Sequence, residues 1–175
     1  CAGAAGFGPI LSLPVESWRQ AVDVNLIGTF LTVKHAGAAM RDAGGGSIVA
    51  ISSIAGLLTH RFLAPYCATK AAVEMLVRCA ADELGPLRIR VNAVRPGLVP
   101  TDMSLPLTED RVITDDYLAQ MPLAKVGTPE DVAAAVRYLA GPESAWVTGQ
   151  CFGVDGGHSL RRGPNLDTMI ERFGG

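Results

Sequence analysis

Three short apolar segments, each followed or preceded by a long helical pattern, constrain the fold of this chain most strongly. The segment Ser47–Ser52, "SIVAIS", is almost wholly apolar and β-branched, which is typical of a parallel strand covered on both faces. Ile89–Gly97 alternates like a strand, and Gly149–Gly157 is expected to hold the last strand and its turn. Strands alternating with helices predict an α/β fold, a doubly wound parallel sheet of the Rossmann type.

The predicted helices are bounded by ordinary start and stop signals. The first covers Ser17–Arg41 and ends at a run of three glycines. The second covers Tyr66–Leu84 and ends at Gly-Pro. The third, Thr128–Gly141, begins with a threonine cap, a proline and two acids. Residues 98–127 carry three prolines, so a long loop with one or two short helices is expected there.

Composition narrows the class of protein. The 175 residues are 49% hydrophobic and 18% charged, as in one soluble globular domain. The net charge is −2 and no long basic run occurs, so we expect neither nucleic acid nor membrane as a partner. The four cysteines lack the spacing of a zinc site, which predicts no metal, free thiols and a cytoplasmic location.

Tyr66 and Lys70 stand four residues apart in the second predicted helix, so they share one face. An ammonium group near a phenol favours the phenolate, and we expect it to lower the pKa of Tyr66 from about 10. Such a tyrosine exchanges protons at neutral pH. The alternative is a plain surface pair.

Two polar residues upstream strengthen this hypothesis. Ser53 ends the first predicted strand, at the edge where such a fold assembles its site, although a serine there also serves local backbone groups. Asn25 lies inside a helix where asparagine is unfavourable. With Gly28 it marks either a kink that frees a carbonyl for water or a solvent-facing residue.

These residues resemble the motifs of the short-chain dehydrogenase/reductase family. The motifs, in order along nearly the whole chain, are "CAG" at 1–3, "VN" with Asn25, "ISS" with Ser53, "YCATK" with Tyr66 and Lys70, "RPGLVPT" from Arg95 to Thr101, and "VDGG" at 154–157. Each is weak alone, and all six at family spacing are specific. The resemblance implies an NAD(P)-dependent oxidoreductase that interconverts a secondary alcohol and a ketone.

The resemblance also implies a role for each catalytic residue. Tyr66 is expected to be the acid in carbonyl reduction and the base in alcohol oxidation, and Ser53 to polarise the substrate oxygen. Lys70 is expected to bind the nicotinamide ribose and lower the Tyr66 pKa, while Asn25 holds a water that links Lys70 to solvent. Help of this kind contributes about 10²- to 10⁴-fold in rate.

The same resemblance assigns cofactor contacts. The residues expected to bind NAD or NADP, which this chain does not distinguish, are Ala2, Gly3, Tyr66, Lys70, Pro96, Gly97, Val99 and Thr101. Glycine at 97 is expected to let the backbone approach the ligand closely, and the proline before it to direct the chain out of the strand.

Residues 102–127 would form the substrate loop of such an enzyme. Its apolar residues, which suggest a fairly apolar alcohol or ketone, are Met103, Leu105, Leu107, Val112, Ile113, Tyr117, Leu118 and Met121. The resemblance further implies a homo-oligomer, a tetramer or a dimer, that pairs the Asn25 and Tyr66 helices across one interface and the last strand and its preceding helix across another. Residues 158–175 would be a C-terminal extension, in which Arg161, Arg162 and a short helix at Leu166–Phe173 either reach a neighbouring subunit or fray.

The family's glycine-rich phosphate turn has no counterpart in this sequence. We therefore expect residues 1–175 to be part of a single Rossmann-type domain of a longer enzyme, the other option being a shortened chain that binds no dinucleotide. Two further alternatives stay open. One is a non-catalytic dinucleotide-binding sensor or scaffold, and the other is a thiol enzyme with Cys67 as nucleophile and His60 as base.

Overall fold

The computed structural model describes residues 3–160 and contains one parallel three-stranded sheet. The strands, in the order β1-β2-β3 across the sheet, are β1 (Gly46–Ile51), β2 (Ile89–Pro96) and β3 (Cys151–Val154). The α/β class and the parallel pairing predicted from the sequence are confirmed. The third strand lies inside the range predicted for the last strand and its turn, and the turn follows at Gly156 and Gly157, whose φ of 62° and 84° take the backbone out of the extended region.

The first predicted helix is a continuous rod of three parts. It comprises α1 (Val15–Ala21), the π-helical turn η1 (Val22–Ile27) and α2 (Gly28–Asp42). The rod ends where predicted, since Gly44 and Gly45 adopt φ of 87° and 140°. The π-helical turn was not predicted as such, and it lies where the sequence indicated a kink at Asn25.

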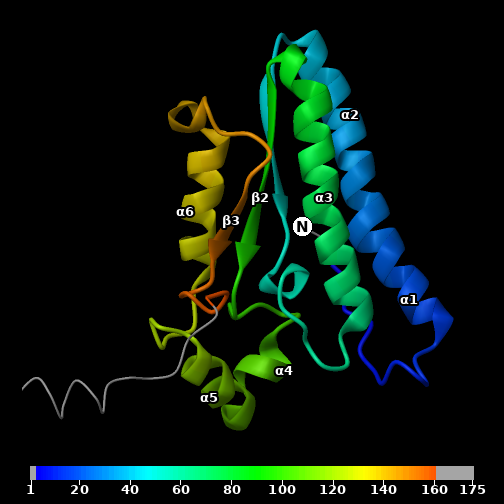
Figure 1. Cartoon of the computed structure of the whole chain (residues 1–175), viewed down its shortest axis with the longest axis vertical. Coiled ribbons are helices and arrows are strands. Elements are labelled where there is room, and N and C mark those ends of the chain that lie inside the picture. Colours follow the sequence, from blue (N-terminus) through cyan, green and yellow to red (C-terminus); the bar gives the residue numbers. More distant parts are fainter. Residues whose placement is uncertain (1–2, 161–175) are drawn as a thin grey trace, which may run out of the picture.

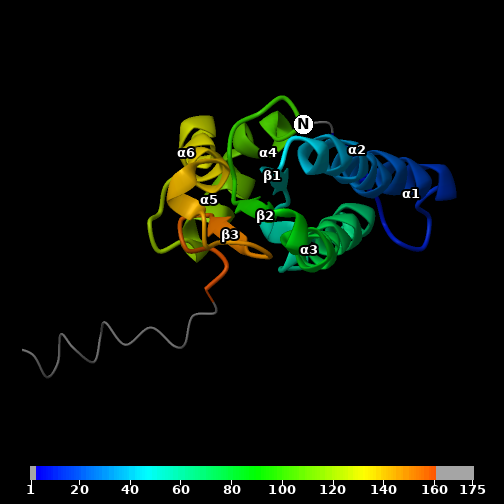
Figure 2. The ribbon, with the colours of Figure 1, turned by 90° about the horizontal axis from the view of Figure 1, so that it is seen from above.

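Helices cover both faces of the sheet. Figure 1 and Figure 2 show α2 and α3 (Ala64–Leu84) on one face and α6 (Pro129–Ala140) on the other. The core between α3 and the sheet is built from small and β-branched residues, among them Val73, Val77, Val91 and Ala93, each at most 1% exposed. Because both faces are covered, β2 is buried along most of its length, and the alternation seen in its sequence does not correspond to one solvent-facing side.

Helix α6 begins as its sequence predicts. The Thr128 hydroxyl accepts from the Asp131 N–H at 3.2 Å, and the Asp131 carboxylate accepts from the Thr128 N–H at 2.9 Å. This reciprocal capping box satisfies two backbone donors that the helix itself leaves without partners. Short 3-10 turns, η2 (Ile54–Gly56), η3 (Gly85–Leu87) and η4 (Pro142–Ser144), complete the connections.

The long connection after β2 folds into two short helices, as predicted. They are α4 (Leu105–Thr108) and α5 (Arg111–Gln120), and Figure 1 places both beyond the carboxyl ends of the strands. Of the predicted C-terminal extension, only residues 158–160 are described; Arg161, Arg162 and the helix expected at 166–173 lie outside this range. Within residues 3–160, no helix combines the length and apolar character needed to cross a membrane.

Candidate active site

The carboxyl ends of the three strands carry the polar residues that the sequence singled out. Ser52 and Ser53 follow β1, Gly97 follows β2 and Asp155 follows β3. Helix α3 brings Tyr66 and Lys70 to the same end of the sheet, because its first turns pack beside η2. This is the edge at which parallel α/β folds bind their ligands.

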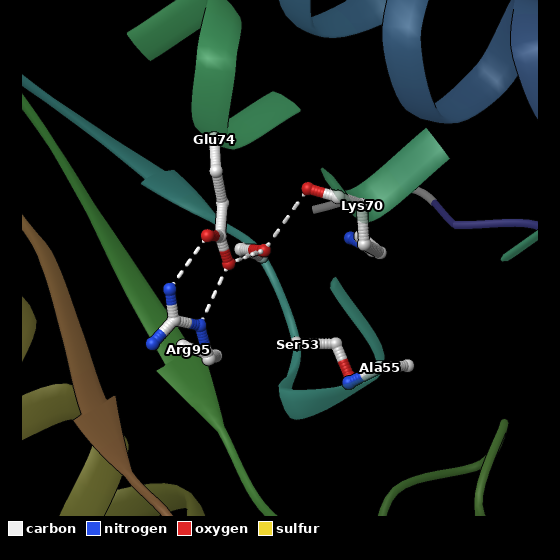
Figure 3. A network of polar contacts seen from close by, with 6 residues as sticks. Ser53, Ala55, Lys70, Glu74 and Arg95 are labelled. Carbon is white, nitrogen blue, oxygen red and sulfur yellow. Dashed lines mark hydrogen bonds and ion pairs between the residues drawn. The ribbon is translucent and has the colours of Figure 1, made fainter. Parts of the chain in front are cut away.

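Tyr66 and Ser53 meet at this edge. Burial of the phenol raises the pKa of Tyr66, and the Ser53 hydroxyl opposes that rise because it can donate a hydrogen bond to the phenolate. The Ser53 hydroxyl also accepts from the Ala55 N–H at 3.2 Å, as Figure 3 shows. Ser53 thus makes the local backbone contact expected of an ordinary strand-end serine and also interacts with Tyr66.

Lys70 is buried beside Tyr66, and its geometry bears on the predicted lowering of the Tyr66 pKa. Its Nζ lies 5.5 Å from the centroid of the Tyr66 ring and donates to the Ile51 carbonyl at 2.9 Å. The expected lowering of the Tyr66 pKa by Lys70 is wrong for this chain, since the ammonium is directed at a backbone carbonyl and burial of the phenol dominates. Burial also lowers the pKa of Lys70 itself. Tyr66 is therefore a protonated phenol at neutral pH.

Asn25 is 2% exposed, so the solvent-facing alternative is wrong. Its side-chain amide accepts from the Ala4 N–H at 2.9 Å and donates to the Ala4 carbonyl at 2.8 Å and to the Thr69 hydroxyl at 2.9 Å. Its backbone carbonyl accepts from the Thr29 hydroxyl at 2.6 Å. Asn25 therefore joins the N-terminal segment, the π-helical turn and helix α3, three segments that no local pattern connects.

Two predicted cofactor residues lie at the start of the chain. Gly3 is exposed and sits next to Asn25, and a Cβ at this position would come within 2.9 Å of the Met103 methyl group. The structure thus brings Gly3, the Asn25 turn and the start of the substrate loop together. Ala2 lies outside the described residues.

The turn after β2 holds the other predicted cofactor residues. At Gly97, whose backbone was expected to approach a ligand, a Cβ would come within 2.8 Å of Asp155 Cα, so the close approach that requires glycine is to the end of β3. Pro96 ends β2, Val99 is half-buried and Thr101 is exposed. The Thr101 N–H donates to the Ser104 hydroxyl at 2.8 Å, a contact that fixes the turn and that the sequence did not predict.

A buried polar network behind Lys70 was also not predicted. The Glu74 carboxylate accepts from Arg95 Nε at 2.7 Å and Nη2 at 2.6 Å, and from the Ser52 hydroxyl at 2.9 Å (Figure 3). The Ser52 hydroxyl also lies 3.3 Å from the Lys70 carbonyl oxygen. The Arg95 pair helps to hold the pKa of Glu74 below its ordinary value. The available signal was the four-residue spacing of Lys70 and Glu74, which puts an acid on the inner helix face.

The substrate loop is only partly apolar on its inner side. Met121 is 3% exposed and packs inward, whereas Val112 is 80% exposed, because it lies in the first turn of α5 on the outer side. Of the rest, Leu107, Ile113, Tyr117 and Leu118 are half-buried, and Met103 and Leu105 are exposed. Tyr117 contacts two histidines, with ring centroids 6.0 Å from His60 and 5.3 Å from His158. Sequence reasoning did not connect these three residues.

The thiol-enzyme alternative gains no support from the geometry. His60 Nδ1 lies 3.1 Å from the Leu58 carbonyl oxygen, an acceptor that requires a proton on that nitrogen. Cys67 is half-buried on α3. Within residues 3–160, no group of three or more His, Cys, Asp or Glu side chains is placed to hold a metal ion.

Comparison with known proteins defines the class to which this fold and edge belong. A family described as enoyl-(acyl carrier protein) reductase matches residues 1–159. A solved short-chain type dehydrogenase/reductase from Mycobacterium ulcerans superposes with a TM-score of 0.89 at 46% identity, over 98% of this chain and 63% of that one. The chain belongs to the short-chain dehydrogenase/reductase family, and its fold is Rossmann-like.

Individual relatives differ in activity. The chain is 43% identical to the inactive 2-(S)-hydroxypropyl-CoM dehydrogenase 2 of Xanthobacter autotrophicus, over 89% of this chain and 70% of that protein. It is 37% identical to the galactitol 2-dehydrogenase (L-tagatose-forming) of Cereibacter sphaeroides, over 91% of this chain and 63% of that protein. The chain therefore spans about two thirds of the length of these relatives.

Two similar solved structures contain a nicotinamide cofactor. A gluconate 5-dehydrogenase from Burkholderia cenocepacia J2315, in complex with NADP and tartrate, has a TM-score of 0.90 at 29% identity, over 92% of this chain and 63% of that one. A 4-hydroxyisoleucine dehydrogenase complexed with NADH has a TM-score of 0.89 at 28% identity, over 93% and 67%. Structures similar to this chain thus occur with either nucleotide.

Proposed function

We propose that this chain is the catalytic part of an NAD(P)-dependent oxidoreductase that interconverts a secondary alcohol and a ketone. The observation that carries the proposal is the meeting of the Tyr66 phenol with the Ser53 hydroxyl at the carboxyl edge of the sheet, with Lys70 buried beneath the phenol ring. Residues 1–175 would form part of a single Rossmann-type domain, with 102–127 as the substrate loop and 158–175 as an extension.

Tyr66 acts as the proton donor in the reducing direction. Burial keeps its phenol protonated, so a proton is available for the oxygen of a carbonyl substrate. Because the Ser53 hydroxyl accepts from the Ala55 N–H, its own proton is free to donate to the same substrate oxygen. In the oxidising direction, the Tyr66 phenol first gives its proton to solvent, and the resulting phenolate then takes the proton from the alcohol.

The residues present fit a nicotinamide cofactor. Lys70 Nζ has three donors and uses one on the Ile51 carbonyl, which leaves two for ribose hydroxyls. Gly3 and Thr101 are exposed near this edge, and Pro96, Gly97, Val99 and Ala2 are proposed to complete the contacts. Bound NAD or NADP supplies the hydride donor or acceptor. Asn25 positions the segment after Gly3 through its contacts with Ala4. It is also proposed to hold the water of a proton relay.

The substrate and the assembly are part of the proposal. The apolar residues of the loop favour a fairly apolar alcohol or ketone. A homo-oligomer is favoured by the exposed large side chains of α2 and α3, such as Phe30 and Met75, and by the fully exposed Trp146 with the Tyr138–Phe152 ring pair near β3. The proposed location is cytoplasmic, consistent with the free thiols of Cys67, Cys79 and Cys151.

The test measures nicotinamide reduction and oxidation by the full-length polypeptide with a panel of secondary alcohols and ketones. Replacing Tyr66 by Phe is expected to lower kcat/KM by about 10²- to 10⁴-fold, because the proton donor is lost. Tyr138→Phe is the matched control, since Tyr138 is exposed on α6 and contacts Phe152. Equal rates in the wild type and Tyr66→Phe would contradict the role of Tyr66.

A second candidate is a non-catalytic dinucleotide-binding sensor or scaffold. It is favoured by one observation, the 43% identity to a relative that is named inactive. Calorimetric binding of NAD or NADP, together with no turnover of any alcohol or ketone, would support the sensor against the enzyme.

A further inference from the structure

Three side chains from separate segments form a cluster beside Tyr66, which we call the imidazole–phenol cluster. His60 comes from the connection between β1 and α3, Tyr117 from α5 and His158 from the segment after β3. The Tyr117 ring lies 6.0 Å from His60 at 37° and 5.3 Å from His158 at 84°, an edge-to-face contact. The cluster thus joins the substrate loop to the segments that follow two strands.

The cluster borders the site that contains Tyr66. Burial raises the pKa of the Tyr117 phenol, and Tyr66 adds to that rise because the two phenols lie within electrostatic range of each other. The His60 segment is also tied to the start of α3, because the Leu63 N–H donates to the His60 carbonyl at 3.1 Å and the Cys67 N–H donates to the Leu63 carbonyl at 2.9 Å. A molecule whose reacting oxygen meets Tyr66 and Ser53 would therefore extend toward the cluster.

The cluster contains unused hydrogen-bonding capacity. His158 is 8% exposed, and its Nδ1 is buried without a hydrogen-bond partner within residues 3–160. Leaving a buried polar atom unpaired costs its desolvation free energy, so native proteins rarely keep one that nothing ever satisfies. His60 uses its Nδ1 proton on the Leu58 carbonyl, which leaves Nε2 as an acceptor in the neutral ring.

The charges around the cluster select the kind of group that can enter it. Burial lowers the pKa of His158, so its imidazole is neutral at pH 7, and the carboxylates of Asp116 and Asp155 lie within electrostatic range. Asp155 is held as a carboxylate by the N–H groups of Gly157 and Ser159, at 3.0 and 2.9 Å. An anionic group would thus meet negative charge, whereas a hydroxyl both donates and accepts and so matches imidazole nitrogens and a phenol.

We propose that the imidazole–phenol cluster of His60, Tyr117 and His158 binds a second, neutral hydroxyl group of the substrate, so that the preferred substrate is a diol, polyol or hydroxyketone. The inference rests on the proposed function, because it places the reacting oxygen at Tyr66. The apolar loop residues then contact the carbon framework, and the cluster contacts the hydroxyl that does not react. His158 and Tyr117 are specificity-determining residues in this arrangement.

The experiment compares matched substrates of the full-length protein: vicinal cyclohexanediol, cyclohexanol and hydroxycyclohexanecarboxylate. The wild type is expected to show a kcat/KM about ten- to a hundredfold higher for the diol than for cyclohexanol, because only the diol satisfies His158. His158→Leu is expected to reduce this ratio to near one, and Tyr117→Phe to lower it in the same direction. His35→Leu, an exposed histidine on α2, is the matched control and should keep the ratio.

Three results would overturn the proposal: no preference for the diol, a preference for the carboxylate, or a diol preference that persists in both His158→Leu and Tyr117→Phe. Should His158→Leu fail to fold, Tyr117→Phe decides, since it removes only an oxygen. If no alcohol is turned over, the proposed function fails. Binding of the diol to the cluster is then measured by NMR. A shift of the His158 imidazole C–H signals on titration with vicinal cyclohexanediol supports the subsite, and no shift refutes it.

Discussion

At the scale of single residues, buried polar side chains fix the position of the candidate site. Lys70 and Glu74 are buried one helical turn apart on α3, and Ser52 contacts both of them from the end of β1. Arg95 on β2 neutralises Glu74 through two hydrogen bonds. The network therefore locks the helix that carries Tyr66 to two neighbouring strands, and the depth of Lys70 beneath the Tyr66 ring depends on it.

The Glu74–Arg95 pair makes a pH-dependent contribution to stability. The pKa of Glu74 in the folded chain is below its ordinary value of 4.5, so the contribution is present above that value and is lost as the pH falls through the folded-state pKa. Glu74→Gln is expected to lower the free energy of unfolding at pH 7 by about 2–3 kcal/mol, because Arg95 stays buried without its partner. The wild type and the variant should converge once the pH has fallen below the folded-state pKa of Glu74.

Urea unfolding at a series of pH values measures this effect. Glu83→Gln serves as the control, since Glu83 is exposed on the same helix. A Glu74→Gln curve that runs parallel to the wild type from neutral to acid pH would show that the ion pair makes no net contribution.

At the scale of elements, the N-terminus of α6 offers a test of local stabilisation. Thr128→Ala removes the hydroxyl that accepts from the Asp131 N–H and is expected to cost about 1 kcal/mol of unfolding free energy. Thr32→Ala is the matched control, because the Thr32 hydroxyl bonds back to the Gly28 carbonyl in the middle of α2, where alanine is at least as favourable. Chemical denaturation should separate the two variants, and equal stabilities would count against the capping box.

How far the sequence predicts an element depends on whether its determinants are local. The start of α6 and the glycine stop after α2 were predictable because cap and turn residues adjoin them. The π-helical turn of Val22–Ile27 was not, because it accompanies the contacts of Asn25 with Ala4 and Thr69, residues far away in the chain. The third strand and its turn were predictable, because the glycines that flank the strand are local turn signals.

The candidate site follows the same rule. Tyr66 and Lys70 share a helix face, and Ser53 ends a strand, so their proximity was predictable from spacing. The imidazole–phenol cluster joins three segments that meet only when the sheet and the loop are assembled, and the pairing of Glu74 with Arg95 requires the packing of α3 on β2. The sign of the Tyr66 pKa shift also depends on burial, which spacing does not reveal.

At the scale of the whole molecule, α2 and α3 carry large apolar side chains on the side away from the sheet. Phe30, Leu31 and Met75 are 45%, 43% and 54% exposed. A groove lies between the two helices, lined in part by Phe30, Gly37 and Leu76. Gly37 is buried where α2 approaches Leu84 of α3 in the same chain. An isologous contact between two copies would bury the exposed apolar side chains of this face on both.

This face predicts the assembly state of the full-length protein. Sedimentation equilibrium is expected to give a mass above that of one chain for the wild type, and Phe30→Glu is expected to shift the mass downward, because a carboxylate buried in an apolar interface loses its hydration without a partner. Val112→Glu is the matched control, since Val112 is 80% exposed on α5 beyond the carboxyl ends of the strands. The control should keep the wild-type mass. A monomeric wild type, or equal masses for Phe30→Glu and the wild type, would show that the α2 and α3 face is not an interface. The next surface to test, by a substitution to Glu, is the one near β3 that carries the exposed Trp146 and the Tyr138–Phe152 pair.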